Sequence, residues 1–173
     1  MSGFVEAARF AFVPRLEAAT ADIRRELRAL PAAAFAPAAD SLTTVEAGYD
    51  ETGWLYFDLH GDGDFAVNRA RCPITAAAVA EVPGLRNAGF SRFVAGTHLY
   101  PHRGELPGVL RCHLPLEVPA GDLGIRFGDE TRRWQFGRCL IIDDTQEHTA
   151  WNHGDGDRVV LLITFTDDRA SVA

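Results

Sequence analysis

The chain has 173 residues and a formal net charge of −7, and 47% of its residues are hydrophobic while 24% are charged. This composition is that of an ordinary globular protein and excludes a disordered or fibrous chain, and the length suits one domain with its own core. The negative charge disfavours nucleic acid as a partner, and no apolar run approaches the roughly 20 residues that span a bilayer. We therefore expect a single cytoplasmic domain, residues 1–173, that binds neither nucleic acid nor a membrane.

The cysteines suggest no covalent framework. Cys72, Cys112 and Cys139 are odd in number, widely spaced and in no CxxC pair. They therefore indicate neither a set of disulfides nor a thiolate zinc site. Cys112 and Cys139 stand in apolar runs, so we expect them to be small apolar residues of strands.

Two helices are predicted in the first half of the chain. Apolar residues recur every three or four positions over residues 16–30, with Pro14 near the start and Pro31 after the end. A second, shorter helix is predicted over residues 74–82, where Thr75 is the expected N-terminal cap and the following proline ends the helix.

Short β-branched or aromatic runs between tight-turn clusters fill most of the remaining chain. They favour an antiparallel sandwich or barrel over a doubly wound sheet. The sequence HGDGD occurs twice, at residues 60–64 and 153–157, and we interpret both copies as turns rather than calcium loops. The predicted strands are residues 89–95, 109–118, 123–128, 138–144, 148–152 and 158–165.

Five of the six histidines lie in the strand-rich half of the chain, between residues 98 and 153. Histidine is the commonest ligand for Fe, Zn and Cu, and a barrel of strands can aim several side chains at one point. Any one histidine alone is more often a satisfied core or surface residue, so the cluster carries the prediction of a site. The histidines are His60, His98, His102, His113, His148 and His153.

Alternation along one predicted strand separates polar from apolar side chains. Arg111 and His113 share one face, and Cys112 and Leu114 share the other. The polar pair faces either solvent or a pocket.

Residues 148–165 are typical of a β-hairpin with its turn at residues 152–157. In that pairing His148 and Arg158 lie opposite each other on one face of the two strands. A permanently charged guanidinium beside a histidine suits a site that binds a carboxylate, because arginine binds carboxylates with two hydrogen bonds.

The stretches GTHLYPHRG, LRCHLPL, LIIDDTQEHTAWN and DRVVLLITF resemble, in order and spacing, the motif series of the aspartyl/asparaginyl β-hydroxylases, over about residues 90–165. This resemblance implies a mainly β fold, a double-stranded β-helix of the jelly-roll or cupin-like kind, with flanking N-terminal α-helices. It also implies a helical, loop-rich support region at residues 1–88 and a core that holds the motifs at residues 89–167.

The same resemblance implies Fe(II), 2-oxoglutarate as cosubstrate, and O2. It places iron on His102 and His148, and it pairs Arg158 with the far carboxylate of 2-oxoglutarate. The further positions that it places around cosubstrate and substrate are Ser91, Arg111 and His113.

Gly104 departs from the pattern of most 2-oxoglutarate oxygenases, which carry a carboxylate ligand two residues after the first histidine. The family that the chain resembles also has glycine there, so the departure agrees with the resemblance. The nearest carboxylate, Glu105, is expected to point to the strand face opposite His102.

The other histidines receive lesser roles. His98 has the strand parity of His102, and we expect it to be structural or to support the ligands. His153 is expected at an exposed turn tip, and a loose match of the N-terminal region suggests that His60 reaches the pocket.

The resemblance implies hydroxylation of an unactivated C–H bond, for example at a β-carbon, of an amino acid, a peptidyl Asp or Asn, or a carrier-tethered aminoacyl group. Val109 stands where the peptide hydroxylases of the family often have an arginine, so one candidate anchor for an acidic substrate is missing. Two alternatives stay open: a 2-oxoglutarate-dependent halogenase, in which chloride takes the position of the missing carboxylate, and a non-catalytic cupin-like module that binds a metal or a carboxylate.

Overall fold

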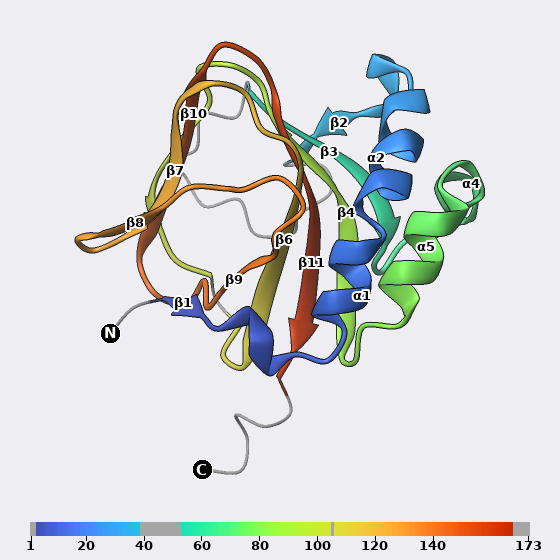
Figure 1. Ribbon diagram of the computed structural model, residues 1–173, viewed down its shortest axis with the longest axis horizontal. Helices are drawn as coiled ribbons and strands as arrows, with labels where there is room; N and C mark the ends of the chain where they lie inside the picture. The colour runs from blue at the N-terminus through green and yellow to red at the C-terminus, as the bar shows by residue number, and fades with distance from the viewer. Residues whose placement is uncertain (1–2, 39–52, 105, 168–173) are drawn as a thin grey trace.

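Two antiparallel sheets packed face to face form the body of the protein, and helices cover the outer face of the larger sheet (Figure 1). The computed structural model describes residues 3–38, 53–104 and 106–167. The larger sheet has the order β1-β9-β6-β11-β4-β3-β2 and the smaller sheet has the order β5-β10-β7-β8. In chain order the strands are β1 (Phe4–Val5), β2 (Ala36–Pro37), β3 (Trp54–His60), β4 (Leu85–Phe93), β5 (His98–His102), β6 (Val109–Glu117), β7 (Gly121–Phe127), β8 (Glu130–Arg132), β9 (Leu140–Ile142), β10 (His148–Gly154) and β11 (Arg158–Thr166).

All of the predicted strands are present, although their bounds differ by a few residues. The largest difference is at the strand predicted over residues 89–95, which runs from Leu85 to Phe93, and within residues 138–144 only Leu140–Ile142 form a strand. Strand β3 was not predicted; it precedes the recognised motifs but pairs with β4 inside the larger sheet.

The first predicted helix is present but divided at Ala19. Thr20 Oγ1 donates a hydrogen bond to the carbonyl of Glu17 at 2.6 Å, and such a local side-chain bond competes with the regular helical ladder. None of the helices in the described residues is long and apolar enough to cross a membrane. The helices are α1 (Val13–Ala18), α2 (Thr20–Ala29), α4 (Ala66–Arg71) and α5 (Pro73–Ala80), and the 3-10 turns are η1 (Ala7–Arg9) and η2 (Ala32–Ala34).

The predicted cap of the second helix is wrong. Thr75 lies inside α5, and Cys72 is the N-terminal flanking residue, without a capping side-chain bond of its own. The carboxylate of Glu26, on α2, instead accepts hydrogen bonds from the backbone N–H groups of Ile74 and Thr75, both at 2.8 Å. A carboxylate suits this place because the first N–H groups of a helix lack intrahelical partners and carry partial positive charge.

The predicted hairpin of residues 148–165 is also wrong. Strand β10 pairs with β5 and β7, whereas β11 pairs with β4 and β6, so the short connection between them crosses from one sheet to the other. The side chain of Asn152 is fully buried at this crossing and donates to the carbonyls of Phe93 and Gly156, each at 2.9 Å. Local alternation cannot reveal the crossing, because it is the same for a strand in either sheet.

The central strand β11 is buried on both faces. Leu161 and Ile163 pack with the helices, while Val160 and Leu162 pack between the sheets. Arg158 begins the strand on the inner side and is 1% exposed. The fold therefore places a charged side chain at the edge of the apolar layer between the sheets.

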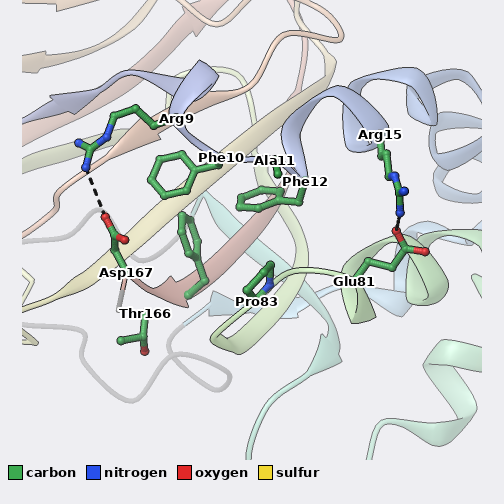
Figure 2. A pocket seen from close by; sticks show the side chains of 10 residues that line it. Arg9, Phe10, Ala11, Phe12, Arg15, Glu81, Pro83, Thr166 and Asp167 are labelled. Atoms are coloured by element: carbon green, nitrogen blue, oxygen red, sulfur yellow. Dashed lines mark hydrogen bonds and ion pairs between the residues drawn. The ribbon is translucent and has the colours of Figure 1, made fainter. Parts of the chain in front are cut away.

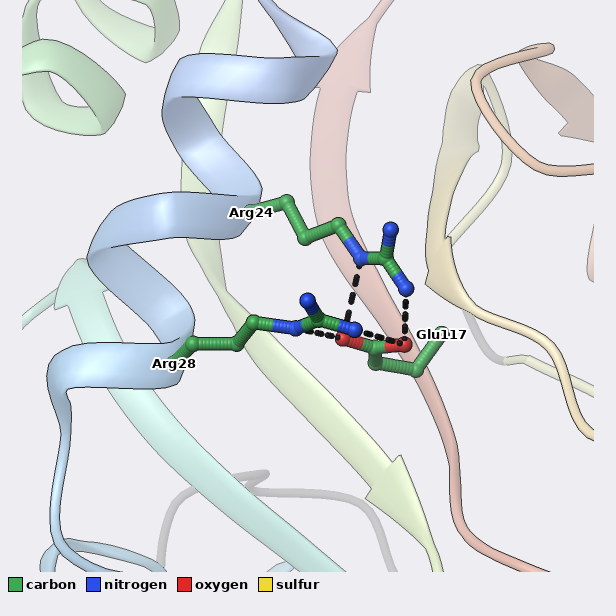
Figure 3. Close-up of polar contacts among 3 residues, drawn as sticks. All are labelled: Arg24, Arg28 and Glu117. Atoms are coloured by element: carbon green, nitrogen blue, oxygen red, sulfur yellow. Dashed lines mark hydrogen bonds and ion pairs between the residues drawn. The ribbon is translucent and has the colours of Figure 1, made fainter.

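A three-residue ion-pair cluster joins α2 to the edge of the helix-covered face (Figure 3). Arg24 donates from Nε and Nη2 to Glu117, at the end of β6, at 3.0 and 2.7 Å, and Arg28 Nε donates to the same carboxylate at 2.7 Å. These hydrogen bonds, that of Arg24 above all, lower the pKa of Glu117 from 4.5 to about 2. The cluster holds α2 against the larger sheet.

Candidate functional site

A pocket lies between the two sheets, and both apolar and polar side chains line it. Apolar side chains such as Leu99, Ile125 and Leu162 come from both sheets, and polar side chains stand among them. The structure brings together all the residues to which the motifs gave a site role, since the pocket is lined by Ser91, His102, Arg111, His113, His148 and Arg158.

His102 and His148 lie side by side, on neighbouring strands of the smaller sheet. They are directly opposite in the β5–β10 register, and their ring centroids are 4.2 Å apart. His102 Nδ1 lies 2.7 Å from the carbonyl of Tyr100, and His148 Nδ1 lies 2.8 Å from the carbonyl of Gln146. A carbonyl only accepts, so each Nδ1 carries a proton. In a neutral ring Nε2 then carries the lone pair, through which a histidine can bind a metal.

The described residues contain no cluster of three or more His, Cys, Asp or Glu side chains that could hold a metal ion. Glu105 lies outside the described residues, so its predicted orientation is not tested. Burial, and next the neighbouring His102, lower the pKa of His148 from 6.5 to about 4. His148 is therefore neutral at pH 7, the state in which a histidine binds a metal.

The prediction that His98 shares the strand face of His102 is wrong because β5 contains a bulge. His102 pairs with His148, and Leu99 pairs with Ala150. Between these two pairs, β5 therefore has one more residue than β10, which is a bulge. Leu99 and His102 consequently both line the pocket, and His98 turns outward.

On the outer face His98 stacks on Trp151 with ring centroids 6.2 Å apart. Its Nδ1 lies 3.2 Å from Nε2 of His153, which belongs to β10 rather than a turn tip but is exposed as expected. His60 ends β3 and is not among the residues that line the pocket, so the suggestion that it reaches the pocket is wrong.

Arg158 is a buried cation without an ionic partner among the described residues. Its guanidinium lies over the rings of Phe93 and Trp134, with its carbon 3.7 and 4.6 Å from their centroids. Nε and Nη2 are buried and have no hydrogen-bond partner in the described part of the chain. Burial lowers the pKa of Arg158 to about 9, so the group still carries its charge at neutral pH. Unpaired buried donors of this kind fit a carboxylate ligand.

Arg111 is already paired within the pocket. Its Nε donates to the carboxylate of Asp144, a buried residue that the motif DDTQEH contains but to which the sequence analysis gave no role. Gly104 donates its backbone N–H to the Asp144 carbonyl at 2.6 Å, and a Cβ on Gly104 would lie 2.5 Å from both carboxylate oxygens. The Asp144 carboxylate thus occupies the space into which a side chain at position 104 would project.

Two tryptophans of the pocket were also missed. Trp54 Nε1 donates to Ser91 Oγ at 3.0 Å, and Trp134 Nε1 donates to His113 Nδ1 at 3.2 Å. Both indoles are distant in sequence from the residues that they contact, so local spacing gave no signal for them. Burial, and then the charge of Arg158, hold the pKa of His113 well below its usual value, so this ring is neutral at pH 7.

A second hollow lies on the surface beside the ends of β11 and α5, and its floor is made of aromatic rings (Figure 2). Its charged ends are ion pairs, Arg9 with Asp167 at 3.7 Å and Arg15 with Glu81 at 3.1 Å. None of its lining residues is a histidine or cysteine. The pocket between the sheets is therefore the stronger candidate for chemistry.

The family model for aspartyl/asparaginyl β-hydroxylases matches residues 17–168. The chain belongs to this family. The resemblance that the motifs predicted is confirmed, and the match extends from the end of α1 to the end of β11, so it includes α2, α4 and α5 as well as the motif-bearing strands.

The names of two similar proteins state different substrates. The ornithine lipid ester-linked acyl 2-hydroxylase of Rhizobium tropici is 45% identical over 137 residues, which make up 78% of this chain and 49% of that protein. The human aspartyl/asparaginyl β-hydroxylase is 32% identical over 116 residues, or 64% of this chain and 15% of that protein. The chain thus spans about half the length, or less, of these relatives.

Solved structures of low sequence identity share the fold. HygX from Streptomyces hygroscopicus, with nickel and 2-oxoglutarate bound, gives a TM-score of 0.57 at 12% identity over 88% of this chain and 79% of that one. A Pseudomonas putida prolyl-4-hydroxylase gives 0.53 at 17% identity over 95% and 93%. The predicted double-stranded β-helix with flanking N-terminal helices is confirmed.

Proposed function

We propose that this protein is an Fe(II)- and 2-oxoglutarate-dependent hydroxylase, with iron on His102 and His148 and the far carboxylate of 2-oxoglutarate on Arg158. The observation that carries the proposal is the combination, in one pocket, of two histidines whose Nδ1 atoms are held by backbone carbonyls and a buried guanidinium without an anionic partner among the described residues. Membership of the family supports the same assignment.

The donor set fits both groups. Two imidazoles suit a ferrous ion, and the buried guanidinium donors suit a carboxylate. When bound, iron with 2-oxoglutarate and O2 supplies the oxidising power to insert one oxygen atom into a C–H bond.

The residues of the chain bind and orient these groups and exclude water. Tyr100 and Gln146 carbonyls fix the two histidine rings, and the apolar walls around Leu99 and Leu162 keep the reacting C–H bond in a dry pocket. Ser91 and His113 are proposed to contact the cosubstrate, and Arg111 to act together with Asp144.

For the substrate we favour an acyl chain linked to a lipid headgroup over a free amino acid or a peptide. The 45% identity to the Rhizobium tropici acyl hydroxylase exceeds the 32% identity to the human peptide hydroxylase. The pocket has apolar walls from both sheets, and position 109, where peptide hydroxylases often have an arginine, is a buried valine. An aspartyl or asparaginyl peptide, an amino acid and a carrier-tethered aminoacyl group are the rival substrates.

Chlorination is disfavoured by the surroundings of Gly104. A halogenase needs room for chloride where the usual carboxylate ligand would stand, and here the carboxylate of Asp144 occupies the direction of the missing side chain.

One experiment separates these possibilities. The protein is incubated with Fe(II), 2-oxoglutarate and ¹⁸O2 in chloride-rich buffer, with ornithine lipid, an aspartyl peptide or free amino acids as substrate. We expect succinate and an acyl chain that gains one labelled oxygen and no chlorine, read by mass spectrometry. A chlorine isotope pattern would overturn the hydroxylase proposal, and absence of succinate with every substrate would favour the non-catalytic module. Labelled peptide with unlabelled lipid would reject the lipid substrate alone.

A further inference from the structure

Trp134 makes contacts with both of the side chains that carry unpaired donors in the pocket. The residue lies between β8 and β9 and is 3% exposed. Its ring plane lies within 19° of that of His113, with centroids 6.2 Å apart, and its ring centroid lies 4.6 Å from the guanidinium carbon of Arg158. One buried indole therefore supports residues from two different strands, β6 and β11.

The hydrogen bond from Trp134 decides where the proton of His113 resides. An indole N–H can only donate, so His113 Nδ1, at 3.2 Å, must accept and cannot carry a proton. In a neutral ring the proton is then on Nε2. This Nε2 is buried, lines the pocket with the rest of the ring, and has no partner among the described residues. A buried donor without a partner costs free energy unless a ligand accepts from it.

We propose that Trp134 is a positioning residue for the cosubstrate: its N–H fixes the Nε2–H tautomer of His113, and its ring, with that of Phe93, holds the Arg158 guanidinium. The unpaired donors of His113 and Arg158 are then presented to the same bound dicarboxylate. This inference rests on the proposed function, because it takes 2-oxoglutarate as the ligand.

The alternative tautomer shows why the contact matters. Without the indole donor, His113 could place its proton on Nδ1 and turn the Nε2 lone pair toward a carboxylate, where two acceptors would repel each other. Burial makes protonation of both nitrogens costly, so the ring cannot restore the donor by taking up a second proton. The tautomer therefore determines whether His113 attracts or repels the ligand.

The first measurement is the tautomer itself, in the metal-free wild-type protein. Long-range ¹⁵N–¹H NMR correlations distinguish the two tautomers, and the His113→Gln spectrum identifies the His113 signals. We expect the Nε2–H form in the wild type and a mixture, or the Nδ1–H form, in the Trp134→Phe protein. An Nδ1–H tautomer in the wild type would overturn the inference, even if the variant failed to fold.

The second measurement is the affinity for 2-oxoglutarate, titrated by calorimetry into Mn(II)-loaded protein without turnover. Trp134→Phe keeps a ring beside Arg158 but loses the donor, so Kd should rise about three- to tenfold, as expected for one hydrogen bond. Trp151→Phe, on the outer face of β10, is the matched control and should leave Kd unchanged. In a His113→Gln background, where the amide supplies its own donor, Trp134→Phe should have less than about a twofold effect.

The two proposals fail in different ways. If the wild-type protein does not bind 2-oxoglutarate, the proposed function fails, and this inference fails with it. If the wild type binds and a folded Trp134→Phe protein binds within twofold of it, the inference alone is overturned. A merely structural role for Trp134 would lower the melting temperature but would leave the tautomer of His113 unchanged.

Discussion

Glu117 and Arg158 lie on opposite faces of the larger sheet and differ in whether the described part of the protein supplies a partner for their charge. On the side of the helices, Glu117 receives hydrogen bonds from two arginines of α2 (Figure 3). On the side of the smaller sheet, Arg158 is almost fully buried and has no ion-pair partner in the described residues. A buried charge without a partner is destabilising. An unpaired buried charge is therefore expected where a ligand provides the partner.

Strand β6 shows the same contrast within a few residues. Cys112 and Leu114 are fully buried in the helix-side core, while Arg111 and His113 face the pocket. The helix-covered face thus pairs Glu117 within the protein, whereas the pocket face has buried donors that the proposed ligand would pair. Substitutions at the histidine pair, at Arg158 and at Glu117 test this comparison.

The largest effect is expected from the histidine pair. His102→Ala or His148→Ala should abolish turnover and lower iron content, because each removes one of two proposed protein ligands. Metal content is measured by mass spectrometry of the purified protein, and turnover by succinate formation. His153→Ala, on the outer face, is the matched control and should retain both. Full activity of the His102→Ala protein would refute the ligand assignment.

Arg158→Met should raise the Kd for 2-oxoglutarate at least about thirtyfold, since it removes a charge-assisted pair in a partly dry pocket. The same change removes an unpaired buried charge, so the free energy of unfolding should be unchanged or higher. Calorimetric titration and urea denaturation measure the two quantities. An unchanged Kd would reject Arg158 as the cosubstrate anchor.

Glu117→Gln should show the reverse: an unchanged Kd and a free energy of unfolding lower by about 1 kcal/mol, the scale of a partly exposed ion pair. The pKa of Glu117 is depressed to about 2, so its stabilisation is fully present above its ordinary pKa of 4.5 and is lost as the pH falls through 2. The difference between the two proteins in urea denaturation should therefore shrink from pH 5 to pH 2.

Glu81→Gln is the control for this change. The Arg15–Glu81 pair has a similar distance of 3.1 Å, but its side chains are 80% and 58% exposed, so its loss should cost less than about 0.5 kcal/mol. If both glutamates had equal effects, the Glu117 cluster would have no special role in holding α2.

The sequence by itself determined the features that depend on local pattern. Alternation placed Arg111 and His113 on one face of β6, and the motif order identified the family and the residues that meet in the pocket. These inferences succeed because a strand has a period of two and because the motif residues keep fixed local neighbours.

Tertiary structure alone decided which strands face each other. The crossing between β10 and β11 places His148 and Arg158 in different sheets, and a bulge in β5 reverses the parity of His98. Trp54 and Trp134 join the pocket from segments outside the recognised motifs, and Asp144 takes the space beside Gly104. Such pairings are non-local: the same alternation of side chains is compatible with several partner strands, and only packing of the two sheets selects among them.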